Sequence, residues 1–335
     1  MKILSVLIVV AVAATAYISV YGVAGNDLES QFTSYMTNYG KNYQTEAEYN
    51  FRLSVFQDSL RVINAHNAKG KSYTMGVNAF TDWTKEEYKR MLGYKPQMKN
   101  EDTEASLSDL PTNCKDLKYE TLDWKSKGYV TPVKNQGACG SCWAFSAVGS
   151  LEGAYFKKYN ELVSFSEQQL VACDKTSHGC NGGLMTNGFI HWMRDAPRTE
   201  EAYPYKPTDD TCHEDTIATE IPELEYGYRV DITQECLYEA LTHGPTSVAI
   251  RAENDEFRHY SGGIIDDDGC GTDLDHGVTT VGYDADTESW LVKNSWGPTW
   301  GEEGYVRIKR TGGLGFCGIN QENAQAVYDL GDWDL

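Results

Sequence analysis

A cysteine in the middle of the chain has the surroundings of a nucleophile. Cys142 follows a short Gly140-Ser141 turn and opens a run whose apolar residues repeat at helical spacing. Ser141 is a residue type that caps helices, so the thiol is expected on the first turn, at the positive end of the helix dipole. That field favours the thiolate, the form of cysteine that attacks carbonyl carbons. The sequence therefore predicts a reactive thiol at Cys142.

Three further residues could serve such a thiol. His276 precedes an apolar strand pattern, and its imidazole can take the thiol proton to leave a thiolate–imidazolium pair. Asn294 stands two residues before Trp296, so its amide oxygen can accept the imidazole N–H while the indole shields that bond from water. The side chain of Gln136 and the free backbone N–H of Cys142 can both donate to an oxyanion. Together these residue types predict acyl transfer.

The pair Cys139 and Cys142 also allows two other interpretations. A Cys-x-x-Cys pair can be a redox dithiol, or half of a zinc site completed here by Cys173 and Cys180. Redox motifs of the thioredoxin kind place a tryptophan before the first cysteine, whereas Trp143 follows the second. Zinc sites favour paired short spacings, and Cys173 and Cys180 lie seven positions apart. We therefore expect no metal and no redox role.

The elements that would position these residues change in type along the chain. Residues 27–70 carry apolar residues at helical spacing, and a short strand pattern follows at residues 73–80. Residues 97–109 are polar and acidic with nothing to bury, which predicts an exposed linker of the kind that proteases cut. Helices with cysteine-rich loops then extend to about residue 225, and strand patterns dominate the remainder. This order predicts an α+β fold of two lobes with a cleft between them.

The N-terminus predicts entry into the secretory pathway. After Lys2 an uncharged stretch reaches residue 26, and small residues precede two cleavage positions, after Ala16 and after Ala24. This pattern is typical of a signal peptide over residues 1–24. An uncleaved anchor is the alternative, but the later half of the stretch is too polar for one, and we expect no stable membrane span. Nine cysteines in an exported chain imply disulfides, and an odd number leaves at least one thiol unpaired.

The charge balance restricts the partners. The 335-residue chain carries a formal net charge of −20, most of it after residue 117. Such a surface repels nucleic acid and anionic membranes, so we expect neither as a partner. Its self-repulsion falls in an acidic compartment, which points weakly to a lysosome or digestive vacuole, with secretion as the other destination. Mere solubility explains the charge equally well.

Taken together, these motifs resemble one enzyme family. The run from Gln136 through Cys142 to Trp143, with its distant His276 and Asn294, is similar to papain-like cysteine peptidases of the cathepsin L branch, and the resemblance covers nearly everything after the signal peptide. It implies a papain-like two-lobed α+β fold, with a helical left lobe, a β-barrel-like right lobe and the active-site cleft between them. It also implies Cys142 as nucleophile, His276 as general base and then acid, Asn294 as orienting residue and Gln136 in the oxyanion hole, with no cofactor.

The resemblance extends to the segment before the linker, which is similar to an inhibitory prosegment. One family motif is matched by residues spaced along a helix, with Ser59 in place of a family asparagine, and a second motif follows it. The matching residues are Glu48, Arg52, Phe56, Ile63 and Asn67, then Gly76, Asn78, Phe80 and Asp82. The resemblance implies an inhibitory prosegment over residues 25–109 that runs backwards through the cleft of a mature domain over residues 110–335. The mature chain is expected to begin between about 106 and 118.

The prosegment is expected to dissociate from the mature domain at acid pH. Lys85, Lys89 and Arg90 would pair with carboxylates of the mature domain, and those carboxylates lose their charge as the pH falls. The chain would then be a zymogen that is activated by prosegment removal at acid pH.

The family also implies a pairing of cysteines. It gives Cys139–Cys180, Cys173–Cys212 and Cys270–Cys317, and it leaves Cys142 free. Cys114 and Cys236 fall outside the common pattern. They either pair, which would tie the prosegment junction to the body, or remain as two buried thiols.

Substrate selection follows from the same resemblance. Gly182 and Gly183 would hydrogen-bond the substrate backbone, and a bulky apolar P2 side chain would enter a pocket beside them. Glu322 falls where some family members place an acid at the pocket floor, which would also admit arginine; a solvent-facing Glu322 is the alternative. The remaining substrate-binding candidates are Leu184, Met185, Ala249, Leu274, Asp275 and Trp296. The implied partners are protein and peptide substrates, the chain's own prosegment and cystatin-like inhibitors.

The type of peptidase is indicated by an absence in the sequence. Family members with dipeptidyl activity carry adjacent histidines on an occluding loop, and this chain has no His-His pair. The expected activity is therefore a cysteine endopeptidase that works through a thioacyl-enzyme. The alternatives are a catalytically silent papain-like structural or binding protein, a different Cys-His acyl transferase, and an aminopeptidase that keeps a prosegment remnant through Cys114.

Overall fold

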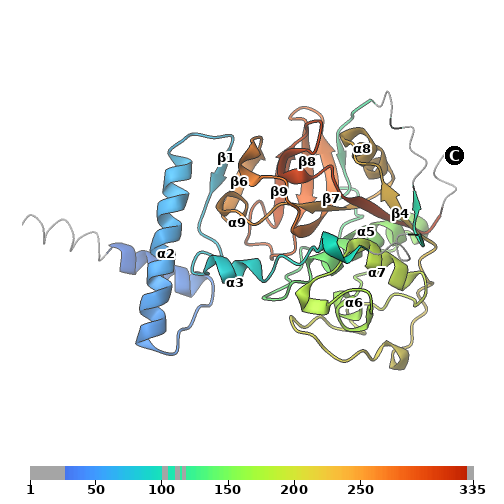
Figure 1. Cartoon of the computed structure of the whole chain (residues 1–335), viewed down its shortest axis with the longest axis horizontal. Coiled ribbons are helices and arrows are strands. Elements are labelled where there is room, and N and C mark those ends of the chain that lie inside the picture. Colours follow the sequence, from blue (N-terminus) through green and yellow to red (C-terminus); the bar gives the residue numbers. More distant parts are fainter. Residues whose placement is uncertain (1–26, 100–104, 110–113, 115–117, 330–335) are drawn as a thin grey trace, which may run out of the picture.

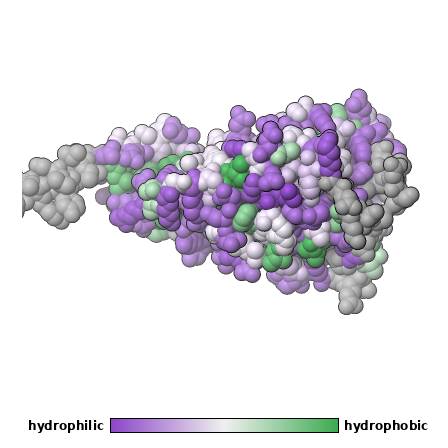
Figure 2. Space-filling view, turned by 90° about the horizontal axis from the view of Figure 1, so that it is seen from above, coloured by the Kyte–Doolittle hydropathy of each residue, from purple (hydrophilic) through white to green (hydrophobic). Residues whose placement is uncertain are grey.

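The computed structural model describes residues 27–99, 105–109, 114 and 118–329. The expected signal peptide, with its cleavage positions after Ala16 and Ala24, lies outside them. Within this part of the chain, no helix is both long and apolar enough to cross a bilayer. Figure 1 shows a helical unit at one end of the molecule and two lobes beside it, one helical and one rich in strands. On the face seen in Figure 2, hydrophilic residues predominate and apolar residues gather only in small groups.

The expected prosegment begins as a helical unit with its own core. Residues 27–38 form one helix, and α2 (Glu46–Asn67) crosses it (Figure 1). Thr45 caps α2 by accepting the Glu48 N–H at 3.1 Å. The residues that form the shared core are Phe32, Tyr35 and Phe56. This unit therefore has a small apolar core separate from those of the lobes.

An extended tail connects this unit to the lobes. Strand β1 (Tyr73–Met75) pairs antiparallel with β6 of the strand-rich lobe. The strand expected over residues 73–80 is thus shorter, because Asn78 turns the chain by accepting the Phe80 N–H at 3.0 Å. Helix α3 (Lys85–Lys89) follows, and a capping box between Thr84 and Glu87 fixes its start. The chain then passes between the lobes to η1 (Pro96–Met98) (Figure 1).

The helical lobe is built on one buried helix. Helix α5 (Cys142–Tyr159) is apolar nearly all round, and it packs against α7 (Met185–Trp192) and α6 (Glu167–Cys173). The lobe also holds the short helices η2 (Gly179–Asn181) and η3 (Glu214–Thr216). Fully buried side chains that form its centre are Trp143, Leu151, Phe189 and Trp192.

The other lobe is a twisted sheet with two α-helices. Its strand order is β1-β6-β9-β8-β7-β5-β10-β4-β2, with β3 attached to β7. The strands are β2 (Ser108–Asp109), β3 (Leu122–Asp123), β4 (Tyr226–Val230), β5 (Thr246–Ile250), β6 (Tyr260–Ile265), β7 (His276–Asp284), β8 (Ser289–Lys293), β9 (Tyr305–Lys309) and β10 (Asn323–Val327). The helices are α8 (Gln234–His243), α9 (Asp255–Arg258), η4 (Asp268–Cys270) and η5 (Phe316–Gly318). The two-lobed α+β fold is confirmed, although the described strands follow an open order rather than a closed barrel.

The lobes meet where α5 lies on β7 (Figure 1). The Ser146 hydroxyl donates to the Val278 carbonyl at 2.6 Å, and the Ser247 hydroxyl donates to the Ser146 carbonyl at 2.8 Å. A Cβ at Gly149 would lie 2.5 Å from the Thr279 hydroxyl, so only glycine permits this approach. This contact brings the first turn of α5 close to the first residue of β7.

The segment before the helical lobe is anchored to the body. Strand β2 pairs parallel with β4, and Leu107 is 7% exposed. The Leu107 side chain packs over Gly227, where an added Cβ would lie 2.9 Å from it. Cys114 is joined to Cys236 of α8. Ala105 and Ser108 are exposed, as predicted for a linker, but Leu107 is buried because this one leucine in a polar run finds an apolar site on the sheet edge.

Candidate active site

Cys142 is the first residue of α5, as its sequence context predicts. Ser141 stands at the N-cap position, but its side chain makes no capping hydrogen bond. Its hydroxyl instead lies 2.7 Å from the hydroxyl of Tyr205. The capping role expected of Ser141 is therefore wrong, because another residue takes up its hydroxyl group.

The Cys142 sulfur is free and fully buried. It accepts backbone N–H groups from Gly93 at 3.2 Å and from Gly277 at 3.4 Å. Gly93 belongs to the expected prosegment, and Gly277 is the residue directly after His276. Cys139 is bonded to Cys180, so neither sulfur is available to Cys142 as a redox partner or to zinc.

His276 occupies the start of β7 and is fully buried. Its Nε2 lies 2.8 Å from Asn294 Oδ1, and this amide oxygen also accepts the Ser295 N–H. Because an amide oxygen only accepts, Nε2 carries the proton and Nδ1 keeps its lone pair. Nδ1 has no hydrogen-bond partner among the described residues. The Trp296 ring lies 4.7 Å from the imidazole, so the indole covers the pair as expected.

Burial acts against ionisation of both groups. It raises the pKa of Cys142 to about 11, although the N–H groups of Gly277 and Gly93 oppose the shift. Burial also lowers the pKa of His276 to about 4, although the hydrogen bond that its Nε2 donates to Asn294 opposes the shift. Burial beneath the prosegment therefore opposes the thiolate that the helix dipole favours.

The Gln136 amide is held from both ends. Its oxygen accepts the Ser295 hydroxyl at 2.6 Å and the Trp296 indole N–H at 3.1 Å. Its nitrogen donates at 2.8 Å to two carbonyls, those of Met91 and Cys139. The amide orientation is thereby fixed, and its N–H already holds a peptide carbonyl of the prosegment.

The prosegment crosses the site as an extended chain. The Gly183 N–H donates to the Gly93 carbonyl at 2.9 Å, and the Lys95 N–H donates to the Gly183 carbonyl at 3.2 Å. The Tyr94 N–H donates to the Asp275 carbonyl at 3.0 Å. At Gly93 a Cβ would lie 1.7 Å from the Gly140 carbonyl oxygen, so no other residue fits there. The segment therefore pairs with the strip predicted to bind substrate backbone.

The predicted P2 pocket is also partly filled by the prosegment. Tyr94 lines a small pocket together with Leu184, Met185 and Glu322. Ala249 is fully buried in the same apolar cluster, and Leu274 packs against it. Gly182, with φ of +114°, leads into this strip. The carboxylate of Glu322 is ion-paired with Lys99 of the prosegment.

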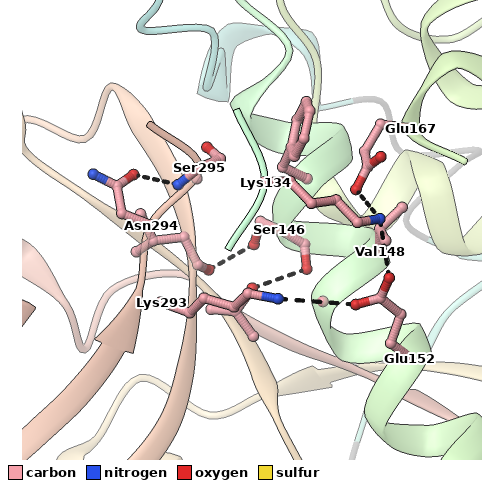
Figure 3. A pocket seen from close by; sticks show the side chains of 13 residues that line it. Lys134, Ser146, Val148, Glu152, Glu167, Lys293, Asn294 and Ser295 are labelled. Atoms are coloured by element: carbon pink, nitrogen blue, oxygen red, sulfur yellow. Dashed lines mark hydrogen bonds and ion pairs between the residues drawn. The ribbon is translucent and has the colours of Figure 1, made fainter. Parts of the chain in front are cut away.

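A buried charge cluster beside the site was not found from the sequence. Lys134 lies 3.0 Å from Glu152 and 2.8 Å from Glu167, and Lys293 approaches Glu152 from the other lobe (Figure 3). Burial raises the pKa of Glu167 to about 7 and lowers that of Lys293. Since Lys293 directly precedes Asn294, the cluster ties the lobe interface to the partner of His276. The sequence did contain one sign of this cluster, because Glu152 places a charged residue within the apolar face of α5.

Four disulfides are present. They are Cys114–Cys236, Cys139–Cys180, Cys173–Cys212 and Cys270–Cys317. The first encloses the longest loop and attaches the junction segment to the sheet-rich lobe. Cys142 is left as the free thiol.

Comparison with known families agrees with this arrangement. Residues 119–327 match the papain family of cysteine proteases, and residues 32–88 match the cathepsin propeptide inhibitor domain. The chain therefore belongs to the papain family of cysteine proteases and carries the inhibitory propeptide of a proform.

Relatives of full length are similar throughout. The chain is 43% identical over 317 residues to the cysteine protease XCP2 of Arabidopsis thaliana, covering 90% of this chain and 89% of that one. It is 40% identical over 333 residues to a cathepsin L-like peptidase of Aedes aegypti, covering 92% and 95%. Among solved structures, digestive procathepsin L2 of the Tenebrio molitor larval midgut aligns with a TM-score of 0.80 at 34% identity, covering 90% and 99%.

Proposed function

We propose that this protease is an endopeptidase that hydrolyses peptide bonds through a thioacyl-enzyme on Cys142. Once the prosegment has left, His276 Nδ1 takes the thiol proton and the sulfur attacks the substrate carbonyl carbon. The side chain of Gln136 and the backbone N–H of Cys142 stabilise the oxyanion. His276 then gives its proton to the leaving amine, and water, activated by the same imidazole, hydrolyses the thioester. Asn294 keeps the ring oriented throughout.

One observation carries this proposal. A peptide segment of the same chain lies in the cleft with its Met91 carbonyl on Gln136 Nε2 and its Gly93 N–H on the Cys142 sulfur. The predicted oxyanion donor and nucleophile thus already contact a peptide backbone. A silent binding protein would have no need for a free thiol, a tautomer-fixed imidazole and an aligned amide around one peptide.

The direction of this segment supports inhibition rather than turnover. In a substrate, the residue in the P2 pocket precedes the residue at the nucleophile, whereas Tyr94 follows Gly93 here. The pairing of Tyr94 with Gly183 is parallel. The prosegment therefore runs backwards, and its peptide bonds are not presented to the sulfur as those of a substrate would be.

We propose acid activation, with a revised set of ion pairs. Lys85 pairs with Asp255 at 3.6 Å and Lys89 with Glu253 at 2.9 Å, but both lysine side chains are largely exposed, so these pairs contribute little. Arg90 makes no ion pair with a described carboxylate. A better candidate across the boundary is Asp267 of the body, which lies 2.6 Å from Lys71. Within the prosegment itself, Arg52 binds Glu87 through two hydrogen bonds and so holds α2 to α3.

The P2 preference is proposed to be bulky and apolar, with arginine also accepted. Leu184 and Met185 supply an apolar wall, and the carboxylate of Glu322 lies at the same pocket. In the proform, a prosegment cation, Lys99, occupies that carboxylate. This contact favours a Glu322 that is accessible to a basic P2 side chain over one that faces only solvent.

The cellular location is proposed to be the secretory pathway, ending in a lysosome or digestive vacuole or outside the cell. An aminopeptidase form is the second candidate function, since the Cys114–Cys236 disulfide could retain a remnant of the junction segment. The mature start, between about 106 and 118, decides which residues such a remnant would contain.

The test begins with purified proform incubated at acid pH beside its Cys142→Ala variant. N-terminal sequencing gives the mature start, and peptides blocked at the N-terminus with varied P2 residues report endopeptidase activity. Labelling of Cys142 by an epoxide reports an activated thiol. Cleavage of unblocked peptides alone would favour the aminopeptidase, and no cleavage or labelling after prosegment removal would reject the proposed function.

A further inference from the structure

The hydroxyl group of Tyr205 joins the two segments that carry the proposed oxyanion donors. It donates to the Gln136 carbonyl at 2.8 Å and lies 2.7 Å from the Ser141 hydroxyl. Because its single proton goes to the carbonyl, the Ser141 hydroxyl must donate to the tyrosine oxygen. Burial raises the pKa of Tyr205, so the phenol stays protonated and keeps its role as donor.

These two contacts reach both sides of the oxyanion site. Gln136 contributes its side-chain N–H, and the peptide that follows Ser141 contributes the N–H of Cys142. Ser141 is fully buried and makes no capping bond, so its hydroxyl is committed to Tyr205. One side chain from a different part of the chain is therefore hydrogen-bonded to both segments that carry the donors.

Tyr205 is itself rigidly held. Its ring packs edge-on against Phe145 of α5, at a centroid distance of 4.8 Å and an interplanar angle of 80°. Its backbone N–H donates to Glu200 at 2.9 Å. The next residues are fixed to α6, because buried Gln168 accepts the Lys206 N–H at 2.9 Å and donates to the Thr208 carbonyl at 3.1 Å. Contacts of this kind hold a supporting side chain to the small tolerance that catalysis needs.

We infer that Tyr205 is a positioning residue that sets the geometry of the oxyanion hole. It touches neither the nucleophile's sulfur nor the imidazole, and it acts through the Gln136 backbone and the Ser141 hydroxyl. The inference rests on the proposed function and deepens it. Since the oxyanion exists only after attack, loss of Tyr205 should slow the chemical step and leave ground-state binding in place.

The test replaces the hydroxyl alone. Tyr205→Phe keeps the ring against Phe145, and Tyr203→Phe is the matched control because its hydroxyl contacts His213 instead. Both full-length proforms are acid-activated and their active sites counted by epoxide titration. For Tyr205→Phe we expect kcat on a peptide amide to fall about 5- to 30-fold, the effect of two hydrogen bonds, with KM within about twofold.

Two further measurements separate positioning from general damage. A peptide aldehyde forms a tetrahedral adduct with an oxyanion, so its Ki should rise by the same factor as kcat falls. Alkylation of Cys142 by iodoacetamide needs no oxyanion hole, so its rate and pH profile should match those of the wild type. Ser141→Ala removes one of the two contacts and should give an intermediate loss of kcat and of aldehyde affinity. This variant replaces Tyr205→Phe in the test if Tyr205→Phe does not fold.

The inference is overturned if kcat and aldehyde affinity of Tyr205→Phe equal those of Tyr203→Phe, or if iodoacetamide alkylation falls in parallel. If Tyr205→Phe does not fold, a Ser141→Ala variant with wild-type kcat overturns it. A wild-type enzyme without activity would instead reject the proposed function.

Discussion

At the scale of single residues, burial in the covered site opposes ionisation of both reactive groups. The sulfur of Cys142 and the imidazole of His276 are both buried beneath the prosegment, and burial shifts their two pKa values in opposite directions. An ion pair between them would need a thiol pKa below that of the imidazole, the reverse of the order here. Departure of the prosegment admits water, and the pair can then ionise. The prosegment thus changes the proton affinities of Cys142 and His276, and it also blocks the access of substrate to them.

Loss of the Gln136 side chain should weaken the transition state far more than substrate binding. For Gln136→Ala in the mature enzyme we expect kcat to fall about 10²- to 10³-fold with little change in KM. Gln234→Ala, on α8, is a control whose amide hydrogen-bonds to Glu235 and Arg310, away from the site. Steady-state kinetics on an amide substrate check this, and a tenfold rise in KM at constant kcat would contradict it.

The carboxylate of Glu322 should decide whether arginine is accepted at P2. For Glu322→Gln we expect kcat/KM for P2-Arg peptides to fall about 3- to 10-fold, the size of a partly exposed ion pair. Hydrolysis of P2-Leu peptides should be unchanged, which supplies the internal control. Equal losses for both peptides would mean that the substitution distorts the pocket instead of removing a charge.

A side chain at Gly93 should prevent the prosegment from lying in the cleft. Because a Cβ there would meet the Gly140 carbonyl at 1.7 Å, Gly93→Ala should process itself faster than the wild type at pH 6. Gln97→Ala, an exposed position on the same segment, should process at the wild-type rate. Gel time courses of the two proforms measure this, and slower processing of Gly93→Ala would refute it.

At the scale of elements, the site depends on how closely α5 approaches β7. The nucleophile lies on one and the imidazole on the other, so their relation is set by packing at Gly149 and by the buried ion pairs of Glu152. Gly149→Ala should lower the free energy of unfolding of the proform by about 1–3 kcal/mol, because its methyl group overpacks the interface. Gly312→Ala, where a Cβ meets nothing closer than 3.9 Å, is the control.

Urea unfolding of both variants measures their free energies of unfolding. Equal unfolding midpoints would contradict the prediction, because they would show that the interface accommodates the methyl group with no loss of stability.

The sequence predicted these elements better than their contacts. Helical spacing identified α5, residue types and their contexts suggested His276, Asn294 and Gln136, and the resemblance implied their roles; the fold brings these residues to one place. The cluster around Lys134 and the contacts of Tyr205 were not foreseen, since both join positions far apart in the chain. Leu107 was misjudged for the same reason: a single apolar residue in a polar run is buried only because Gly227 leaves room for it.

At the scale of the whole molecule, body and prosegment respond to acid with opposite signs. Burial raises the pKa of Glu167 to about 7 and of Asp275 to about 6, so protonation as the pH falls towards 5 stabilises the folded body. In the prosegment contacts, hydrogen bonds from Arg52 lower the pKa of Glu87. For Asp267, burial is outweighed by hydrogen bonds from Lys71 and Gly269, and its pKa is also lowered. The ionised carboxylates of Glu87 and Asp267 therefore stabilise the prosegment and its contact with the body above about pH 4, and this stabilisation is lost as the pH falls below that value.

Prosegment release should therefore accelerate as the pH falls towards about 4, while the body remains folded. Asp267→Asn removes the charge that Lys71 holds, and it should shift the onset of processing to higher pH. Asp286→Asn, on a turn of the body, should leave the onset unchanged. The pH dependence of the processing rate measures both, and equal rates at pH 7 and pH 4 in the wild type would contradict acid activation.

The thermal stability of the body should rise on mild acidification. We expect the Tm of the proform's body to be higher at pH 5 than at pH 7, since Glu167 takes up a proton in the folded state across this range. Glu167→Gln should reduce this difference. Calorimetry at the two pH values measures these Tm values. A lower Tm at pH 5 than at pH 7 would contradict the raised pKa of Glu167.

The path of residues 91–95 through the cleft has a use in ligand design. It is a natural peptide that satisfies Gln136, Gly183 and Asp275 while presenting no bond to the sulfur in the order needed for cleavage. A short synthetic mimic with the same polarity would occupy the enzyme without being consumed, and a mild electrophile placed at the position of Gly93 would convert such a mimic into a selective covalent probe.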